Sequence, residues 1–207
     1  MKQREEGRRR AVKGLKQELI LEAAREVFAA EGLDGATVRA IASRAGYTAA
    51  ALYFHFDSKE AIYAELLRAS LTRLGGAVND ALAGARGPRV QLRAAAMGFF
   101  RFYADNPRDL DLGFYLFRGG MKPAGLGQER DEELNEALSS ALRPIADAAE
   151  ALGASKTSAN TLMVDTFAHA AGLLLLLHTG RIRIFGASAQ ALMEAYVQSR
   201  IEQLTGD

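Results

Sequence analysis

Apolar residues recur along this chain at the spacing of helices, beginning with a stripe near its N-terminal end. That stripe follows an i, i+1, i+4, i+5 pattern and consists of Leu19, Ile20, Ala23, Ala24, Val27 and Phe28. Gly32 stands where such a helix would end. Elsewhere the sequence shows neither the alternating pattern of strands nor an internal repeat. The fold class that we predict is therefore all-α, with about nine helices.

Residues 37–60 have the pattern of a helix-turn-helix followed directly by another helix. Thr37 is a suitable N-cap for a short helix whose apolar face is formed by Val38, Ile41, Ala42 and Ala45. Gly46 suits the left-handed backbone conformation of a tight turn, and Thr48 is a suitable N-cap for the next helix. Two short helices joined by a tight turn are therefore expected here.

A larger helical block is expected beyond the helix-turn-helix. Asp57 and Glu60 have the spacing of a capping box that opens a helix at Lys59, and a pair of glycines at 75–76 weakens the far end of that helix. Further helices are predicted over residues 90–106, 109–118, 128–152, 156–179 and 188–204. The glycine-rich segment 119–127 is predicted to be a loop.

Charge is distributed unevenly along the chain. The formal net charge is +1, but residues 1–16 contain seven basic and only two acidic side chains. This suggests that the N-terminal end approaches a polyanion, while a solvated, disordered start explains the charge equally well. We expect three parts: a basic flexible arm over 1–14, a helix-turn-helix head over 15–58, and a larger helical body over 59–207.

Composition narrows the classes of protein that remain. With 49% hydrophobic and 25% charged residues, the chain has the balance of a soluble globular protein. It contains no cysteine, which excludes disulfides and thiolate-bound metals. No signal peptide is visible, and the most apolar stretch, residues 168–177, is shorter than the roughly 20 residues of a membrane span. We interpret that stretch as part of a buried helix and expect a cytoplasmic protein.

Signals of catalysis or metal binding are missing from the sequence. The three histidines, His55, His169 and His178, are widely separated and do not form a cluster of ligands. The sequence contains no nucleophile elbow, no zinc-binding helix motif and no phosphate-binding glycine loop. We therefore expect no catalytic residue, no metal, no cofactor and no enzyme activity.

The predicted helix-turn-helix has a form that fits the major groove of DNA. The groove admits one helix, whose N-terminal residues reach base edges, while hydroxyl groups and cationic side chains contact phosphates. The candidate DNA-binding residues are Thr37, Arg39, Tyr47, Thr48, Ala49, Tyr53, His55 and Lys59. Both Tyr53 and His55 have an alternative as packing residues of a small helical domain. DNA contact is favoured for Tyr53, and the two interpretations are balanced for His55.

The segment TVRAIASRAGYTAAALYFHFDSKEAIYAELL, residues 37–67, resembles the DNA-binding signature of the TetR (tetracycline-repressor) family. The positions in register are Thr37-Val38, Ile41-Ala42, Ala45-Gly46, Leu52-Tyr53, His55-Phe56 and Ser58-Lys59-Glu60. With the preceding helix included, the resemblance covers residues 15–67. It implies a three-helix DNA-binding head on a helical ligand-binding body that dimerises through its last two helices.

Two places depart from the family pattern. Residues 49–51 are all alanine where members often have a polar or basic residue, then glycine and serine or threonine, and Phe54 occupies a position that is often histidine. The reading helix is therefore poor in hydrogen-bond donors, and its alanines offer only apolar contact, for example to a thymine methyl group. Specificity would then depend on Tyr47, Thr48 and Tyr53, on the shape of the DNA, and on insertion of the basic arm into the minor groove.

Aromatic residues gather in the predicted body and suggest an apolar ligand cavity. The candidate ligand-binding residues are Phe99, Phe102, Tyr103, Phe114, Phe117, Met121, Leu138, Met163, Phe167 and His169. For any single ring, an ordinary place in the core is the competing interpretation. Asp165 and His169 are spaced i, i+4 on an apolar helix, where they would either anchor a ligand or form a satisfied pair in the core or at a dimer interface.

Together these features predict a ligand-responsive transcriptional repressor that binds double-stranded operator DNA as a homodimer and is released by a small apolar effector. The last two helices carry more apolar surface than one layer can bury, which favours a dimer interface between them. No membrane partner is expected. The alternatives are a small-molecule binding protein or enzyme that retains a non-functional head, and an effector-independent activator.

Overall fold

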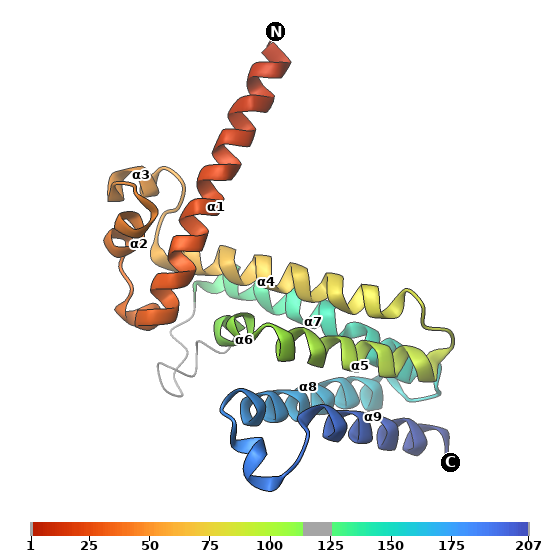
Figure 1. The fold of residues 1–207 in the computed structure, drawn as a ribbon. Coiled ribbons are helices and arrows are strands. Elements are labelled where there is room, and N and C mark those ends of the chain that lie inside the picture. Colours follow the sequence, from red (N-terminus) through yellow and green to blue (C-terminus); the bar gives the residue numbers. More distant parts are fainter. Residues whose placement is uncertain (1, 114–125, 207) are drawn as a thin grey trace. The chain divides into compact units, whose positions relative to one another are not determined.

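The computed structural model describes residues 2–113 and 126–206, with the backbone alone at 2–6, 8–13, 33 and 34 (Figure 1). Nine α-helices and one short 3-10 helix make up this part of the chain, which contains no strand. In chain order the elements are α1 (Lys2–Gly35), α2 (Val38–Ala45), α3 (Ala49–Tyr53), α4 (Lys59–Leu82), α5 (Pro88–Asp105), α6 (Pro107–Gly113), α7 (Gln128–Ala151), α8 (Lys156–His178), η2 (Arg181–Phe185) and α9 (Ala189–Thr205). The all-α prediction is confirmed.

The chain divides into two compact units, and the division falls inside α4. Unit 1 is Met1–Ala69 with Asp111–Leu134, and unit 2 is Ser70–Leu110 with Asn135–Asp207. The sequence places a boundary at the start of α4 instead. The first turns of α4 therefore belong to unit 1 together with the helix-turn-helix, and their packing explains this.

Tyr63 is the side chain that joins the start of α4 to unit 1. It is 2% exposed, and its ring meets Phe28 of α1 edge-on at a centroid distance of 4.9 Å. Its hydroxyl donates a 2.7 Å hydrogen bond to the carbonyl oxygen of Leu112. A buried hydroxyl needs such a partner, because an unsatisfied polar group in the interior costs about 1–3 kcal/mol. This one residue therefore links α1, α4 and the end of α6 within unit 1.

The first helix begins earlier than the sequence predicts. Its backbone is helical from Lys2, so the segment 1–14 that is expected as a flexible arm is helical here. Most residues of that segment are lysine, arginine, glutamine, glutamate or alanine, which favour helix, and a helix already formed beyond them extends at little cost. Gly32, where the helix is predicted to end, interrupts α1 with φ 71° and ψ 178°, a conformation nearly confined to glycine.

Unit 2 is built around α5, which packs against both α8 and α9. α8 and α9 form an antiparallel hairpin that is connected through η2 (Figure 1). α5 also approaches the second half of α4 closely at Gly98, where an added Cβ would lie 3.0 Å from the Cβ of Ala81. A larger residue at Gly98 would push these two helices apart.

Two details of unit 2 differ from the prediction. α4 continues through Gly75 and Gly76 to Leu82, because its buried face offsets the cost of about 1 kcal/mol for each glycine in a helix. That face comprises Leu71, Leu74 and Val78. The short helix η2 is not predicted, and within it Ile182 is buried whereas Ile184 and Phe185 are exposed.

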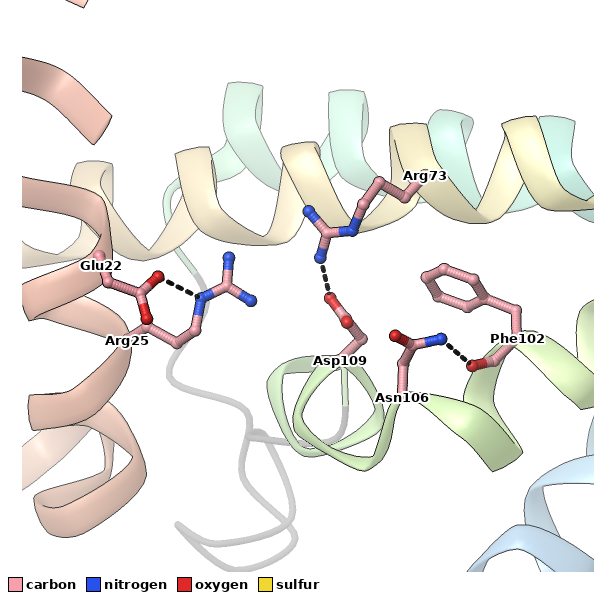
Figure 2. A network of polar contacts seen from close by, with 6 residues as sticks. All are labelled: Glu22, Arg25, Arg73, Phe102, Asn106 and Asp109. Atoms are coloured by element: carbon pink, nitrogen blue, oxygen red, sulfur yellow. Dashed lines mark hydrogen bonds and ion pairs between the residues drawn. The ribbon is translucent and has the colours of Figure 1, made fainter. Parts of the chain in front are cut away.

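A charged pair joins α4 to the start of α6 in unit 2 (Figure 2). Arg73 donates to the carboxylate of Asp109, whose side chain is 6% exposed, while that of Arg73 is 44% exposed. Asp109 lies in the first turn of α6, where the helix dipole also favours a negative charge. Beside it, the amide of Asn106 donates a 2.7 Å hydrogen bond to the carbonyl oxygen of Phe102 (Figure 2). These contacts hold the connection from α5 to α6.

We predict that Arg73→Met lowers the free energy of unfolding by about 2 kcal/mol, because it leaves a buried carboxylate without its partner. The matched control is Arg101→Met, since Arg101 forms an exposed pair with Glu194 at 3.7 Å. Such pairs contribute about 0.5 kcal/mol or less. Urea unfolding followed by circular dichroism measures both variants. Equal losses in the two would contradict the stabilising effect assigned to the Asp109 pair.

Candidate functional site

The caps and the turn of the helix-turn-helix have the predicted geometry. Oγ1 of Thr37 accepts a 3.1 Å hydrogen bond from the backbone N–H of Ala40, and Oγ1 of Thr48 accepts one of 3.2 Å from Ala51. Gly46 has φ 74° and ψ 26°, the left-handed conformation. Because each cap uses a lone pair of the oxygen, the hydroxyl hydrogen remains a donor suited to a phosphate.

Half of the eight predicted DNA contacts are exposed on the surface of unit 1. Arg39, Thr48 and Tyr53 are exposed, as is Thr37. Tyr47 and Ala49 are half-buried. α3 is held from its inner side by Leu52, which is fully buried. A short helix anchored by a buried residue, with exposed hydroxyl and guanidinium donors on the same unit, is an arrangement suited to a DNA groove.

Lys59 makes a contact within the protein. Its Nζ donates a 3.2 Å hydrogen bond to the carbonyl oxygen of Ala36, in the connection between α1 and α2. The side chain is half-buried. Replacing Lys59 would therefore disturb the start of α4 as well as any phosphate contact, so its substitution is a poor probe of DNA binding.

His55 is less exposed than Thr37, Arg39, Thr48 and Tyr53. It is half-buried, and its Nδ1 is buried with no hydrogen-bond partner among the described residues. This favours the packing alternative that the sequence leaves open for His55.

One exposed aromatic residue of the head (α1–α3 and the residues up to 58) is not among the predicted contacts. Phe54, directly after α3, is 86% exposed, more than any other large apolar side chain that the structure describes. Leu52 and Phe56 are spaced i, i+4 and both are buried, which turns Tyr53 and Phe54 outward. That spacing is the signal in the sequence from which the orientation of Phe54 could have been found.

Four of the predicted ligand-binding residues form an aromatic cluster in unit 2. The ring of Phe99 meets Tyr103 at 5.2 Å and Phe167 at 5.8 Å between centroids, and Phe102 meets Tyr103 at 5.1 Å. The three rings on α5 are buried and Phe167 is half-buried. Burial raises the pKa of the Tyr103 phenol far above its usual value, and the negative charge of Asp109 adds to this shift. The cluster has the character of packed core.

The remaining predicted ligand-binding residues are dispersed. Leu138 on α7 and Met163 on α8 are half-buried. Phe114, Phe117 and Met121 lie outside the described residues. The structure therefore brings together the aromatic residues of α5 and α8.

A groove of about 320 Å³ lies in unit 2 between the second half of α4 and α7. Its lining combines small, polar and aliphatic residues, namely Leu71, Thr72, Gly75, Gly76, Val78, Asn79, Ala137, Ser140, Ala141 and Pro144. None of the predicted ligand-binding residues lines it, although its volume is in the range of small-molecule sites. Small residues form no distinctive sequence pattern, so this groove could not be predicted from the chain.

A polar cluster connects α8 to α9 and contains the last predicted ligand-binding residue, His169. The hydroxyl of Tyr196 donates a 2.7 Å hydrogen bond to Oδ2 of Asp165, and the His169 ring stacks on Tyr196 with centroids 4.0 Å apart. The guanidinium of Arg200 lies 5.1 Å from the centre of the Tyr196 ring. Burial lowers the pKa of His169. Burial and the hydrogen bond to Asp165 raise the pKa of Tyr196 to about 12.

The hydrogen-bond partner of Asp165 is therefore Tyr196 of the neighbouring helix. The Nε2 of His169 is buried without a hydrogen-bond partner in the described part of the chain. No group of three or more His, Cys, Asp or Glu side chains among the described residues is placed to hold a metal ion.

The eighth helix is not buried all round, contrary to the sequence interpretation. Its buried residues are Ala159, Leu162, Thr166, Ala170, Leu173 and Leu174. On its other side, Val164, Ala168, Gly172 and Leu175 are exposed at helical spacing, and we call these four residues the α8 strip. α8 is long and apolar enough to cross a membrane by length and composition, and 22% of its most apolar window is buried inside the structure. The exposed apolar residues of the α8 strip account for part of that composition.

Comparison with known proteins identifies the N-terminal part of the chain. Residues 20–66 match the family model described as bacterial regulatory proteins, tetR family. The HTH-type transcriptional repressor KstR2 of Rhodococcus jostii (strain RHA1) is 42% identical over 75 residues, which are 36% of this chain and 37% of that protein. The HTH-type transcriptional activator FasR of Mycolicibacterium smegmatis is 40% identical over 83 residues, which are 40% of this chain and 38% of that protein. The matched segments thus span less than two fifths of either relative.

The similarity of fold extends over nearly the whole chain. The crystal structure of the transcriptional regulator FadR from Bacillus subtilis in complex with stearoyl-CoA matches 91% of this chain and 97% of its own, with a TM-score of 0.65 and 18% identity. At that identity the match establishes a shared fold. The family-model match is confined to residues 20–66, whereas the shared fold covers 91% of the chain.

Proposed function

Because residues 20–66 make this chain a member of the tetR family of bacterial regulatory proteins, we propose that it is a cytoplasmic, ligand-responsive transcriptional repressor. It binds double-stranded operator DNA as a homodimer and is released by a small apolar effector. The observation that carries this proposal is the capped helix-turn-helix, on which Arg39, Thr48 and Tyr53 are exposed.

α3 is the helix that enters the major groove in this proposal. Thr48 at its start and Tyr53 at its end contact the backbone, and Arg39 of α2 contacts a neighbouring phosphate. Each phosphate contact releases condensed cations from the DNA, so the affinity falls as the salt concentration rises. These contacts position the head, and other side chains of the same surface read the bases.

The α8 strip supplies the dimer interface. Val164 and Leu175 are each 59% exposed, and Leu192 on α9 is 42% exposed. A monomer leaves these side chains in water, whereas a two-fold interface buries the strip of each protomer against its partner. Such a dimer presents two recognition helices to operator half-sites about 34 Å apart.

α4 is the element through which an effector acts in this mechanism. It runs without a break from Lys59 to Leu82, its first part belongs to unit 1, and its second part lines the groove of unit 2. An effector changes operator affinity only if it binds one conformation more tightly than the other. To change the dimer from nearly all bound to nearly all free, the binding free energy of the effector must differ by about 5.5 kcal/mol between the two conformations.

We predict sequence-dependent binding to DNA from the region upstream of the protein's own gene, weakened about tenfold by Tyr53→Ala through loss of a backbone contact. Fluorescence anisotropy with a labelled duplex at several salt concentrations measures the affinity and its salt dependence. The matched control is Leu19→Ala, because Leu19 is a similarly exposed residue of unit 1 on α1.

A folded dimer without sequence-dependent DNA binding would refute this proposal and support a small-molecule binding protein with a non-functional head. A reporter gene under the same upstream region determines the sign of regulation. Expression that rises when the protein is removed identifies a repressor. Expression that falls identifies an activator, the function named for the relative FasR.

We expect Val164→Glu combined with Leu175→Glu to produce monomers, because two charges would have to be buried against the partner's apolar strip. Sedimentation equilibrium gives the mass in solution. Ile184→Glu serves as the control, since Ile184 is 78% exposed but lies on η2, outside the α8 strip. A double variant that remains dimeric would exclude the α8 strip as the interface.

We expect an apolar effector to raise the melting temperature of the protein and to weaken operator binding, because it stabilises the conformation that does not bind DNA. Stearoyl-CoA is the first probe, since it is bound in the FadR structure of the same fold. Free stearate and coenzyme A separate the apolar part from the polar part. A compound that raises the melting temperature but leaves operator affinity unchanged would contradict the release mechanism.

A further inference from the structure

The outward face at the end of α3 is almost entirely apolar. Ala50, Tyr53 and Phe54 are spaced i, i+3, i+4, and all three are exposed. We call these three residues the α3 face. Phe54 is 86% exposed, so its ring is not a structural part of the head's core. Neither Ala50 nor Phe54 has a side-chain atom that forms hydrogen bonds, and Tyr53 has only its hydroxyl.

The major groove of DNA offers one apolar group, the C5 methyl of thymine, beside its hydrogen-bond donors and acceptors. An apolar face in the groove can distinguish base pairs only through that methyl group. We propose that Phe54 is a specificity-determining residue that covers thymine methyl groups of the operator. This inference rests on the proposed function, because it requires α3 to lie in the major groove.

The polar side chains of the head occupy positions outside the α3 face. Thr48 caps the start of α3, and Arg39 is exposed on α2. Arg44 forms an ion pair with Glu26 of α1, and the Nζ of Lys59 is bonded to the Ala36 carbonyl oxygen. Arg39, Thr48 and the hydroxyl of Tyr53 therefore suit phosphates, while Ala50 and the ring of Phe54 offer only apolar contact to the bases.

The small size of the α3 face favours DNA over a protein partner. A stable protein interface covers about 800 Å² on each partner. Three side chains, one of them alanine, do not provide that area, since an aromatic residue buries roughly 150–250 Å². A thymine methyl group, in contrast, is covered by a single ring.

The test replaces thymine by uracil in the operator, which removes the methyl group and keeps every hydrogen-bonding group of the base. A binding duplex is first selected from random sequence by the full chain, and one thymine at a time is then replaced. We expect wild-type protein to lose about fourfold in affinity for each methyl group that Phe54 covers. We expect Phe54→Ala to bind the thymine duplex more weakly and to show nearly equal affinities for thymine and uracil at those positions.

The matched control is Phe185→Ala, because Phe185 is 74% exposed but lies on η2 in unit 2. It should keep the wild-type ratio of affinities for thymine and uracil. An unchanged melting temperature of Phe54→Ala shows that the head is intact, as expected for a side chain in solvent.

Two results would overturn the assignment of Phe54 while leaving the proposed function in place. The first is equal binding of wild-type protein to the selected thymine and uracil duplexes. The second is a Phe54→Ala variant that keeps the wild-type ratio of affinities for the thymine and uracil duplexes. This holds if the variant binds as tightly as wild type. It also holds if binding is weakened equally on both duplexes, which is the result that a contact to the sugar-phosphate backbone would produce. Failure to select any duplex would refute the proposed function itself, and the assignment of Phe54 with it.

Discussion

Burial of Tyr63 is the interaction on which the organisation of unit 1 depends. Its ring packs on Phe28 of α1 and its hydroxyl is satisfied by the Leu112 carbonyl, so the first turns of α4 cannot leave the head without exposing both. The division between the units therefore falls within α4, and it also falls within α6 and α7.

The polar groups of the head stabilise its helices and their connections, and the α3 face that remains exposed is mostly apolar. Thr37 and Thr48 satisfy helix starts, Arg44 is paired with α1, and Lys59 is bonded to the α1–α2 connection. Capping of this kind is worth about 1 kcal/mol for each threonine, a substantial contribution for helices as short as α2 and α3. The same arrangement leaves few hydrogen-bond donors for base edges, which is why the exposed Phe54 becomes important for recognition.

In unit 2, the features that suggest a ligand site are separated from one another. The aromatic residues of α5 and α8 fill the core with edge-on contacts, whereas the groove is formed by small residues of α4 and α7. The helical glycines 75 and 76 belong to this groove, and an added Cβ at either one would meet no neighbour. Close packing therefore does not require glycine at these two positions in this conformation. Because they have no side chain, they leave space in the part of the groove that they line.

The sequence by itself determined the helices, the caps and the turn, because these depend on residues within about four positions of one another. Thr37, Gly46 and Thr48 were predicted with their structural roles, and the similarity to a known family rests on the same local segment. The grouping of α4 with the head, the partner of Asp165, the extent to which Phe54 is exposed and the location of the groove followed from the tertiary structure alone. Each of these depends on which distant segments meet and on how much of a side chain they cover, and local spacing carries no information about either.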